Sequence, residues 1–287
     1  MVEIENFSLS YGNSPKVLKD ISLSIDKGEC VLFTGKSGSG KSSIINSING
    51  LAMRYDGAST EGIIKIDNKD IRNLKLYEIS MLVSSVFQNP KTHFFNINTT
   101  LELLFYLENI GLSKKLMDER LNDMLELFPI NHLLNRDIFK LSGGEKQILC
   151  IAASYISGTE IIVLDEPSSN LDEGNITIIK GMLTKLKDKG KTLIISEHRI
   201  FYLMDIIDKI FLIKDGEIQS EYTKIDFMKF STKKLNELGL RDKIKTKLTV
   251  PEIQSGGSLN VKNIEFKFNG IDKRFFFKNI SFEMGKI

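Results

Sequence analysis

Apolar residues recur along the chain with two different spacings. Short runs such as Cys30–Thr34 and Ile161–Leu164 suit strands that are buried on both faces of a parallel sheet. Longer stretches between these runs place Leu and Ile at helical spacing. The predicted strands cover residues 2–10, 17–26, 30–34, 62–67, 81–87, 161–164, 191–196 and 208–214, and the predicted helices cover 42–49, 173–188 and 199–206. This alternation predicts an α/β fold with a mainly parallel core sheet.

Two segments depart from the alternation. Residues 90–157 carry Leu, Glu and Lys at helical spacing, which predicts an inserted helical subdomain. Near the start of the chain, the turn-forming residues of Tyr11–Pro15 join the first two predicted strands. These strands predict an antiparallel β subdomain beside the core sheet.

The opening of the chain is repeated near its end. Residues 4–11 lead to a second apolar segment at 20–23, and residues 261–268 lead to a similar segment at 279–282. The chain is therefore expected to contain one complete domain, a linker and the incomplete start of a second domain, at 1–220, 221–258 and 259–287. The alternative is that two unrelated hairpins share a similar composition.

Composition excludes several classes of protein. Of the 287 residues, 41% are hydrophobic and 26% are charged, which is typical of a globular domain. The net charge of +2 argues against a dedicated nucleic-acid binder, and no apolar run approaches the roughly 20 residues that span a bilayer. Residues 1–5 show neither a basic nor an apolar signal-peptide region. Cys30 and Cys150 lie among apolar residues, so we expect two buried thiols rather than a disulfide.

A glycine-rich loop follows the strand predicted at 30–34. Gly35–Ser42 fits the pattern G-x-x-x-x-G-K-[ST], with a strand before it and a helix after it. Its backbone N–H groups and the start of the next helix form a nest for phosphate groups. Lys41 is expected to reach the β- and γ-phosphates of a nucleotide, and Ser42 to place its hydroxyl on Mg²⁺.

Two carboxylates follow the apolar strand that ends at Leu164. Asp165 is the candidate for the Mg²⁺ shell, and Glu166 is the candidate base that polarises an attacking water. In isolation such a pair is often a solvated acidic turn, but together with the glycine-rich loop Gly35–Ser42, a P-loop, it indicates phosphoryl chemistry.

A third segment, Leu141–Gln147, begins a predicted helix. Ser142 can cap this helix, while Gly143 and Gly144 let its positive N-terminal end approach a phosphate group closely. The alternative is an ordinary helix cap with a flexible entry.

In their order along the chain, which is Gly35–Ser42, Leu141–Gln147 and Asp165–Glu166, the three segments resemble the ABC ATPase family. The resemblance covers residues 1–220 and implies a P-loop NTPase core with an antiparallel β subdomain and a helical subdomain. It also implies that two such domains pack head to tail, with each ATP between the P-loop of one domain and the Ser-Gly-Gly segment of the other. Glu145 stands where many members carry Gln, and this variant occurs in the family.

The resemblance implies roles for four residues outside these segments. Tyr11 lies where the family stacks an aromatic ring on adenine, and Asp172 lies in the loop that touches the opposite site. Gln88 matches the glutamine that senses the γ-phosphate and the metal, and His198 matches the histidine that contacts the γ-phosphate. The implied catalytic residues are Glu166, His198 and Gln88, the implied Mg²⁺ contacts are Ser42, Gln88 and Asp165, and the implied ATP contacts are Tyr11, Gly35, Ser37, Gly38, Ser39, Gly40, Lys41, Ser42, Ser43, Ser142, Gly143, Gly144 and Asp172.

The family resemblance further implies a peripheral protein at the cytoplasmic face of the cell membrane. Its expected partners are a transmembrane transporter subunit and a second ATPase domain, supplied by a longer chain or by a second copy. Phe87–Pro90 and the Glu-His-Arg around His198 are similar to energy-coupling-factor transporters, which import vitamins or metal ions.

Two other functions remain open at this stage. A soluble ABC ATPase acting on ribosomes or nucleic acid usually carries a basic or coiled-coil linker, and residues 221–258 show neither feature. A regulatory subunit that binds nucleotide without turnover is opposed by the presence of Glu166 and His198.

Overall fold

The computed structural model describes residues 1–287 except 56, 239, 241–258, 268–274 and 285–287. The chain divides into two compact units, Met1–Lys243 and Ile244–Ile287. The first unit holds two sheets and the described helices, and the second holds a two-stranded hairpin.

The central sheet of the first unit has six strands in the order β10-β9-β3-β8-β7-β6. These strands are β3 (Cys30–Thr34), β6 (Val83–Val86), β7 (Ile161–Asp165), β8 (Thr192–Ser196), β9 (Lys209–Lys214) and β10 (Glu217–Thr223). Neighbouring strands are parallel except for β10, which pairs antiparallel with β9 at one edge. Every residue of β3, β7 and β8 is buried, because helices and the second sheet cover both faces of these strands. The expected mainly parallel core sheet is confirmed.

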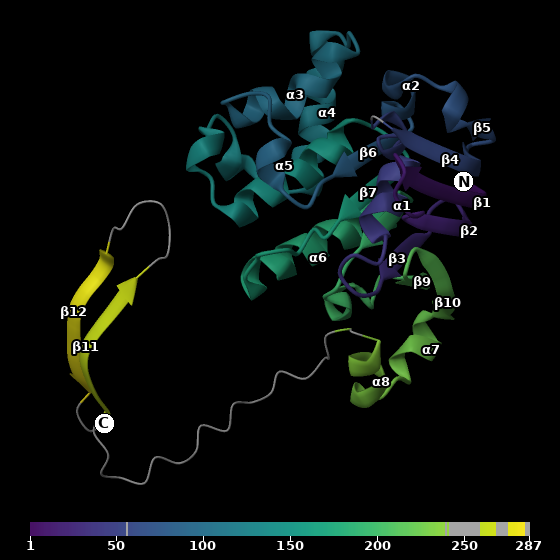
Figure 1. The fold of residues 1–287 in the computed structure, drawn as a ribbon. Helices are drawn as coiled ribbons and strands as arrows, with labels where there is room; N and C mark the ends of the chain where they lie inside the picture. Colours follow the sequence, from purple (N-terminus) through teal and green to yellow (C-terminus); the bar gives the residue numbers. More distant parts are fainter. Residues whose placement is uncertain (56, 239, 241–258, 268–274, 285–287) are drawn as a thin grey trace. The chain divides into compact units, whose positions relative to one another are not determined.

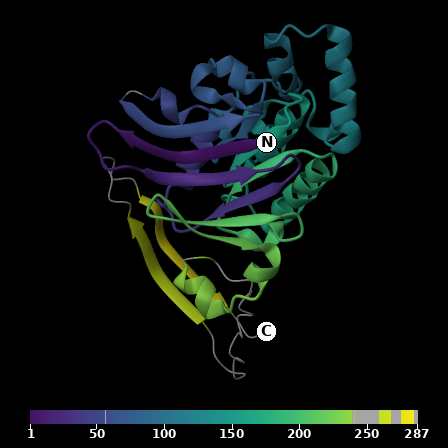
Figure 2. The ribbon, with the colours of Figure 1, turned by 90° about the vertical axis from the view of Figure 1, so that its right-hand side faces the viewer.

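A second sheet is antiparallel and has the order β2-β1-β4-β5. Its strands are β1 (Val2–Tyr11), β2 (Leu18–Ile25), β4 (Ala58–Ile66) and β5 (Lys69–Asp70). Figure 2 shows the three long strands side by side. Gly62 (φ 76°) lies opposite a register shift in β1, and a Cβ there would be 2.3 Å from the carbonyl oxygen of Asn6, so the close approach of these strands requires glycine.

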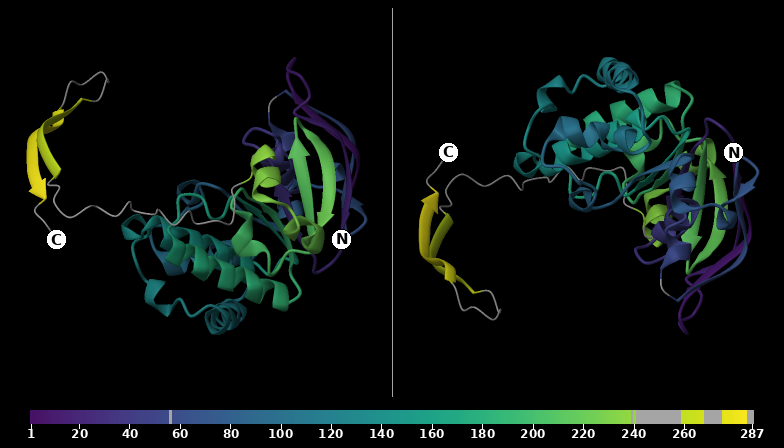
Figure 3. Two further views of the ribbon diagram at one scale, coloured as in Figure 1. Left: turned by 90° about the horizontal axis from the view of Figure 1, so that it is seen from below. Right: turned by 90° about the horizontal axis from the view of Figure 1, so that it is seen from above.

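Helices fill the space between the sheets and cover the outer face of the central sheet. Their bounds are α1 (Lys41–Ile48), α2 (Leu76–Ser80), α3 (Thr99–Asn109), α4 (Lys114–Leu127), α5 (Gly143–Ile156), α6 (Glu173–Asp188), α7 (Lys224–Met228) and α8 (Thr232–Glu237). The expected helical insertion is the group α3–α5, which lies on the opposite side of the central strands from the antiparallel sheet (Figures 1 and 3). Among the described residues, none of the helices is long and apolar enough to cross a bilayer.

Two hydrophobic clusters lie on the two faces of the central sheet. Along β3, Cys30 and Leu32 belong to the cluster that contains residues of α3, α5 and α6, whereas Val31 and Phe33 belong to the cluster that contains α1 and the antiparallel sheet. This alternation follows from the two-residue period of a strand. The sheet is thereby held rigid from both sides, and its carboxyl edge is a fixed platform for side chains.

The carboxyl-terminal part of the first unit differs from the sequence-based expectation. The segment 199–206, expected to be a helix, contains only the short 3₁₀ turn η6 (Ile200–Leu203). The segment 221–258, expected to be a linker, contains the end of β10 and both α7 and α8. Phe227 of α7 contacts Tyr222 of β10, and Phe227 and Leu235 of α8 are buried in one of the hydrophobic clusters, so both helices are part of the first unit. Residues 241–258 of the expected linker lie outside the described residues.

The second unit contains the hairpin of β11 (Leu259–Lys267) and β12 (Phe275–Met284). Its register repeats that of β1 and β2 at three positions that the internal sequence repeat aligns. Val2, Ile4 and Phe7 pair with Ile25, Leu23 and Ile21, and Leu259, Val261 and Ile264 pair with Met284, Phe282 and Ile280. Both hairpins also shift register between the second and third of these pairs.

Both cysteines are buried and free, as expected. Burial raises the pKa of the Cys30 thiol to about 12, and it also raises the pKa of the Cys150 thiol. Because the thiolate is the reactive form, neither residue is suited to chemistry in the folded protein.

We expect neither thiol to react with an aromatic disulfide reagent near neutral pH while the protein is folded, and both to react after unfolding in urea. Spectroscopic titration of the released thiolate measures this. Stoichiometric labelling of the folded protein would contradict the described packing.

Candidate functional site

Four loops meet at the carboxyl edge of the central sheet. They follow β3, β8, β7 and β6, which are neighbours in the sheet and point the same way. The carboxyl ends of parallel strands therefore bring together residues that are far apart in sequence. These loops carry the P-loop, His198, the Asp165–Glu166 pair and Gln88.

The P-loop turns from β3 into α1 through backbone conformations that favour glycine. Gly35 and Gly40 have φ of 147° and 107°, and a Cβ at Gly35 would lie 2.1 Å from the carbonyl oxygen of Ile213. Lys41 is 3% exposed and donates to the carbonyl oxygens of Gly35 and Lys36 at 3.1 and 2.9 Å. Burial lowers the pKa of Lys41, while Glu166, Asp165 and Glu197 act in the opposite direction.

The first turn of α1 is joined to the end of β7 through Asp165. This carboxylate is 8% exposed, and its Oδ1 accepts a hydrogen bond from Ser42 Oγ at 3.1 Å. The same atom accepts a short hydrogen bond from Ser196, its register partner on β8. Ser42 and Asp165 therefore present two oxygen ligands side by side, which is the kind of donor that Mg²⁺ prefers.

Glu166 is the centre of a three-residue constellation. Its Oε2 accepts from the Gln88 amide at 2.9 Å, and its Oε1 lies 3.0 Å from His198 Nε2. The backbone of Glu166 is left-handed (φ 43°), an uncommon conformation for a residue with a side chain. Its N–H donates to Ser196 at 2.9 Å, which holds this turn against β8. The strained turn aims the carboxylate between the other two side chains.

Residues from all four loops line one cavity of about 740 Å³. The predicted site residues on its wall are Ser37, Gly38, Gly40, Lys41, Ser42, Ser43, Gln88, Glu166 and His198. Gly35, Ser39 and Asp165 belong to the loops around it without lining it. The cavity is also lined by residues outside the predicted site set: Val17, Ser168, Ser169, Asn170, Glu197 and Arg199. The charge of Glu197, directly after an otherwise apolar strand, is the signal that could have found it.

Tyr11, at the end of β1, is not among the residues lining this cavity. Its ring makes an edge-on contact with Tyr55, with 6.1 Å between centroids. Burial raises the pKa of the Tyr11 phenol, and the charge that Tyr55 would carry raises this pKa further. Tyr11 also packs against the hydrophobic cluster of the antiparallel sheet, and its placement against adenine stays a prediction.

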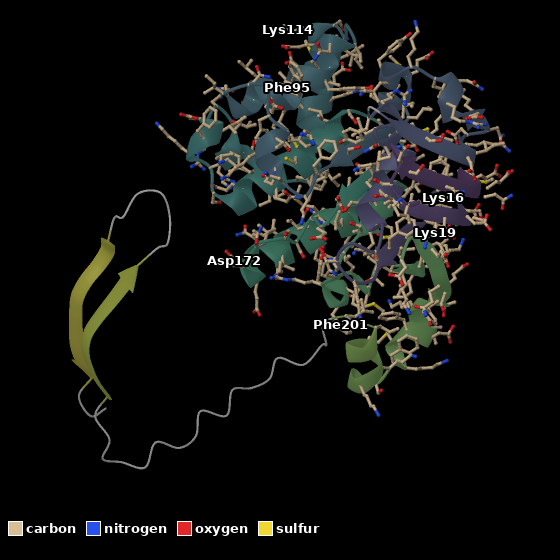
Figure 4. The ribbon with its side chains drawn as sticks, viewed as in Figure 1. Lys16, Lys19, Phe95, Lys114, Asp172 and Phe201 are labelled. Atoms are coloured by element: carbon tan, nitrogen blue, oxygen red, sulfur yellow. The ribbon has the colours of Figure 1, made fainter. Side chains whose placement is uncertain are left out.

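Ser142, Gly143, Gly144 and Asp172 are not among the cavity-lining residues either. Gly144 packs against Asn175, where a Cβ would lie 2.3 Å from the amide carbon of Asn175. Asp172, labelled at the start of α6 in Figure 4, accepts from the backbone and side-chain N–H groups of Asn175 at 2.8 and 3.0 Å. The starts of α5 and α6 are thus joined, and they carry a second group of predicted site residues.

Ser142 and Glu145 cap α5 reciprocally. Ser142 Oγ accepts from the Glu145 N–H at 3.2 Å, and Glu145 Oε2 accepts from the Ser142 N–H at 2.7 Å. Glu145 also forms an ion pair with Arg136 at 2.8 Å. The backbone hydrogen bond from Ser142 and the charge of Arg136 hold the pKa of Glu145 below its usual value. The Glu145 side chain therefore stabilises the N-terminus of its own helix, α5.

Comparisons with known proteins place this geometry in a family. The profile described as ABC transporter matches residues 18–169. Two curated relatives from Treponema denticola, each described as a putative ABC transporter ATP-binding protein, are 36% and 40% identical over 242 residues. These matches cover 84% of this chain but 49% and 50% of the relatives, so the chain spans about half their length.

Solved structures agree with this placement. CbiO1 from Clostridium perfringens, described as part of the ABC transporter complex cbiONQ, is similar with a TM-score of 0.71 and 26% identity over 79% of this chain and 90% of that chain. A dimeric ATP-binding cassette in a post-hydrolysis state, bound to ADP and phosphate, is similar with a TM-score of 0.67 and 27% identity over 78% of this chain and 99% of that chain.

Glu145→Gln keeps the capping geometry but removes the charge. We expect the variant to be less stable than the unaltered protein at neutral pH, by about 0.5 kcal/mol, since the group is partly exposed. The folded-state pKa of Glu145 is lowered, so its stabilisation is present at neutral pH. The difference should therefore shrink below the ordinary glutamate value of 4.5. Urea unfolding at several pH values measures it, and a difference that does not change with pH would contradict the assignment.

Proposed function

This chain belongs to the ABC transporter family and carries its ATPase domain, and we propose that it binds and hydrolyses Mg-ATP to energise a membrane transporter. The observation that carries this proposal is the position of Glu166 between Gln88 and His198, on the wall of the cavity that also contains Lys41 and Ser42. A carboxylate held beside a phosphate-binding loop can polarise a water molecule for attack on phosphorus.

The P-loop supplies the binding energy for the phosphates. Its N–H groups and the N-terminus of α1 attract anions, and Lys41 adds a positive charge. Ser42 and Asp165 would hold Mg²⁺, which would neutralise charge on the phosphate oxygens. Among the described residues there is no cluster of three or more His, Cys, Asp or Glu side chains that could hold a metal. This agrees with an ion held by one carboxylate, one hydroxyl and the phosphates themselves.

Glu166 is proposed as the base, and its two neighbours as the groups that orient it. Gln88 donates its amide N–H to one carboxylate oxygen, and His198 Nε2 lies beside the other. His198 and Gln88 also line the cavity, so either can contact a bound γ-phosphate or the attacking water.

A second ATPase domain is the proposed partner that completes the site. Ser142, Gly144 and Asp172 lie on the joined starts of α5 and α6 rather than on the cavity wall. Placed across a head-to-tail pair, they would close the partner's P-loop. The curated relatives are about twice as long as the matched region, and the β11–β12 hairpin repeats the register of β1–β2. Both facts support a second domain that begins near 259.

A transmembrane subunit is the second proposed partner. An apolar groove of about 440 Å³ runs beside β6, α3 and α5, and Phe87, Phe95, Phe105 and Tyr106 line it. Phe95, labelled in Figure 4, is 77% exposed and stacks on Phe105 with 4.9 Å between centroids. Phe87 lines the groove, and the next residue, Gln88, lines the cavity. A helix of the transmembrane subunit that docked in the groove would therefore be one residue from the proposed nucleotide site. Together with the family resemblance, this groove supports our proposal that the protein is peripheral at the cytoplasmic face of the membrane.

The importer type is a narrower part of the proposal. Phe87–Pro90 and the residues around His198 are similar to energy-coupling-factor transporters, and one structural neighbour is described as part of cbiONQ. We propose import of a vitamin or a metal ion by the assembled transporter.

Glu166→Gln should lower the turnover of ATP at least about 100-fold, the scale for losing a general base, while the affinity for ATP is retained. Phosphate release and equilibrium binding of labelled ATP measure the two effects. Glu160→Gln, at the other end of β7, is the matched control and should turn over normally. Unchanged turnover in Glu166→Gln would remove this residue from the role.

Phe95→Asp should release the full-length protein from the membrane fraction of its source cells, because a charge in the groove opposes burial against a partner helix. Ile225→Asp, at a similarly exposed position of α7 (70%), is the control and should leave the distribution unchanged. Quantitative blotting of the two fractions measures this. Equal retention of both variants would argue against docking at this groove.

A further inference from the structure

Glu197 is a buried carboxylate that faces the loops of the site. It directly follows β8, and it is 2% exposed. Its backbone is fixed to β3, because its N–H donates to Phe33 at 3.1 Å and its carbonyl accepts from Thr34 Oγ1 at 3.0 Å. The side chain therefore starts from a rigid position at the carboxyl edge of the central sheet.

The two carboxylate oxygens of Glu197 bind different segments of the chain. Oε1 accepts from the backbone N–H groups of His198 and Arg199 at 2.7 and 3.0 Å. Oε2 accepts from the N–H and the hydroxyl of Ser168 at 3.2 and 2.6 Å, and from the Tyr202 hydroxyl at 3.1 Å. Burial, followed by the charge of Glu197, raises the pKa of Tyr202, which keeps its phenol a proton donor.

All five of these hydrogen bonds come from neutral N–H or O–H groups. A buried carboxylate costs several kcal/mol of desolvation unless such bonds compensate it. Three of the donors are backbone N–H groups, which cannot reverse their role. A glutamine would turn its NH₂ group towards the donors that bind either Oε1 or Oε2. A carboxylate is therefore the side chain that fits both groups of donors.

The segment Ser168–Asp172 is tied further to the same loop. Arg199 Nη1 donates to the carbonyl oxygen of Leu171 at 3.2 Å. At the end of this segment, Asp172 caps α6 and holds Asn175, and Asn175 packs against Gly144. A continuous set of contacts therefore runs from the backbone of His198 through Glu197 and Ser168–Asp172 to the start of α5.

We propose that Glu197 is a positioning residue that makes the His198 loop and the segment Ser168–Asp172 move as one unit. The proposal rests on the proposed ATPase function. His198 lines the chain's own nucleotide cavity, whereas Asp172 and Gly144 belong to the surface offered to a second ATPase domain. Glu197 thereby links the state of one nucleotide site to the surface that closes the other.

The simpler alternative is a satisfied core carboxylate that only stabilises the fold. Such a residue would change the melting temperature when substituted, but the folded fraction would keep its turnover. A coupling residue instead changes kcat with little effect on KM, since the P-loop that binds the phosphates is left intact. Its effect must also depend on Ser168, because that residue supplies the contact to the second segment.

The test compares Glu197→Gln, Ser168→Ala and the double variant in the full-length protein, with Tyr202→Phe as the control. Steady-state hydrolysis, equilibrium ATP binding and thermal unfolding are measured for each. We expect kcat to fall about 10- to 100-fold in Glu197→Gln, the scale of a small misplacement of site groups, with KM nearly unchanged. The double variant should resemble Glu197→Gln alone, because both changes break the same link. Tyr202→Phe keeps both hydrogen bonds from Ser168 to Glu197 and should change kcat by less than about threefold.

Normal kcat in folded Glu197→Gln, or losses that multiply in the double variant, would overturn the inference. If Glu197→Gln does not fold, Ser168→Ala alone decides: a lowered kcat at unchanged KM supports the link and a normal kcat overturns it. These outcomes differ from failure of the proposed function, in which the unaltered protein itself would not hydrolyse ATP and the inference would fall with it.

Discussion

The hydrogen bond from Ser42 to Asp165 joins the first turn of α1 to the end of β7, and the arrangement of the site depends on it. Ser196 donates to the same carboxylate oxygen, so α1, β7 and β8 are joined at one acceptor. Because both faces of the central sheet are packed, the strands below these loops have little freedom to move. A phosphate that binds the P-loop therefore meets side chains already placed by β7 and β8.

The predicted site residues lie on two different surfaces of the domain. The loops after β3, β6, β7 and β8 surround the cavity, whereas the starts of α5 and α6 form a second surface that Asn175 holds together. An isolated domain of this kind has the groups for binding phosphates, but its Ser-Gly-Gly segment does not line the cavity. The proposed pairing with another domain would bring such a segment to the cavity, and ATP bound between the two domains would favour the paired state.

The sequence was most informative where local chemistry is strict. Gly35 has no space for a side chain, and residues 30–33 and 161–164 have to be apolar because both faces of their strands are covered. It was least informative at the edge of the fold. In β10, Ile218 and Tyr222 alternate with polar residues, and the short helices after it resemble a polar linker by composition. The contacts of Glu197 were also beyond prediction, since Ser168 is distant in sequence and its approach depends on the pairing of β7 with β8.

The cavity at the carboxyl edge of the central sheet is expected to bind the phosphates of ATP together with magnesium. Calorimetric titration of the protein with ATP, in the presence of Mg²⁺ and again with a chelator, measures this binding. We expect saturable binding that weakens when the metal is removed and that Lys41→Ala largely abolishes. A protein that does not bind ATP, or whose binding Lys41→Ala leaves unchanged, would refute this role of the cavity.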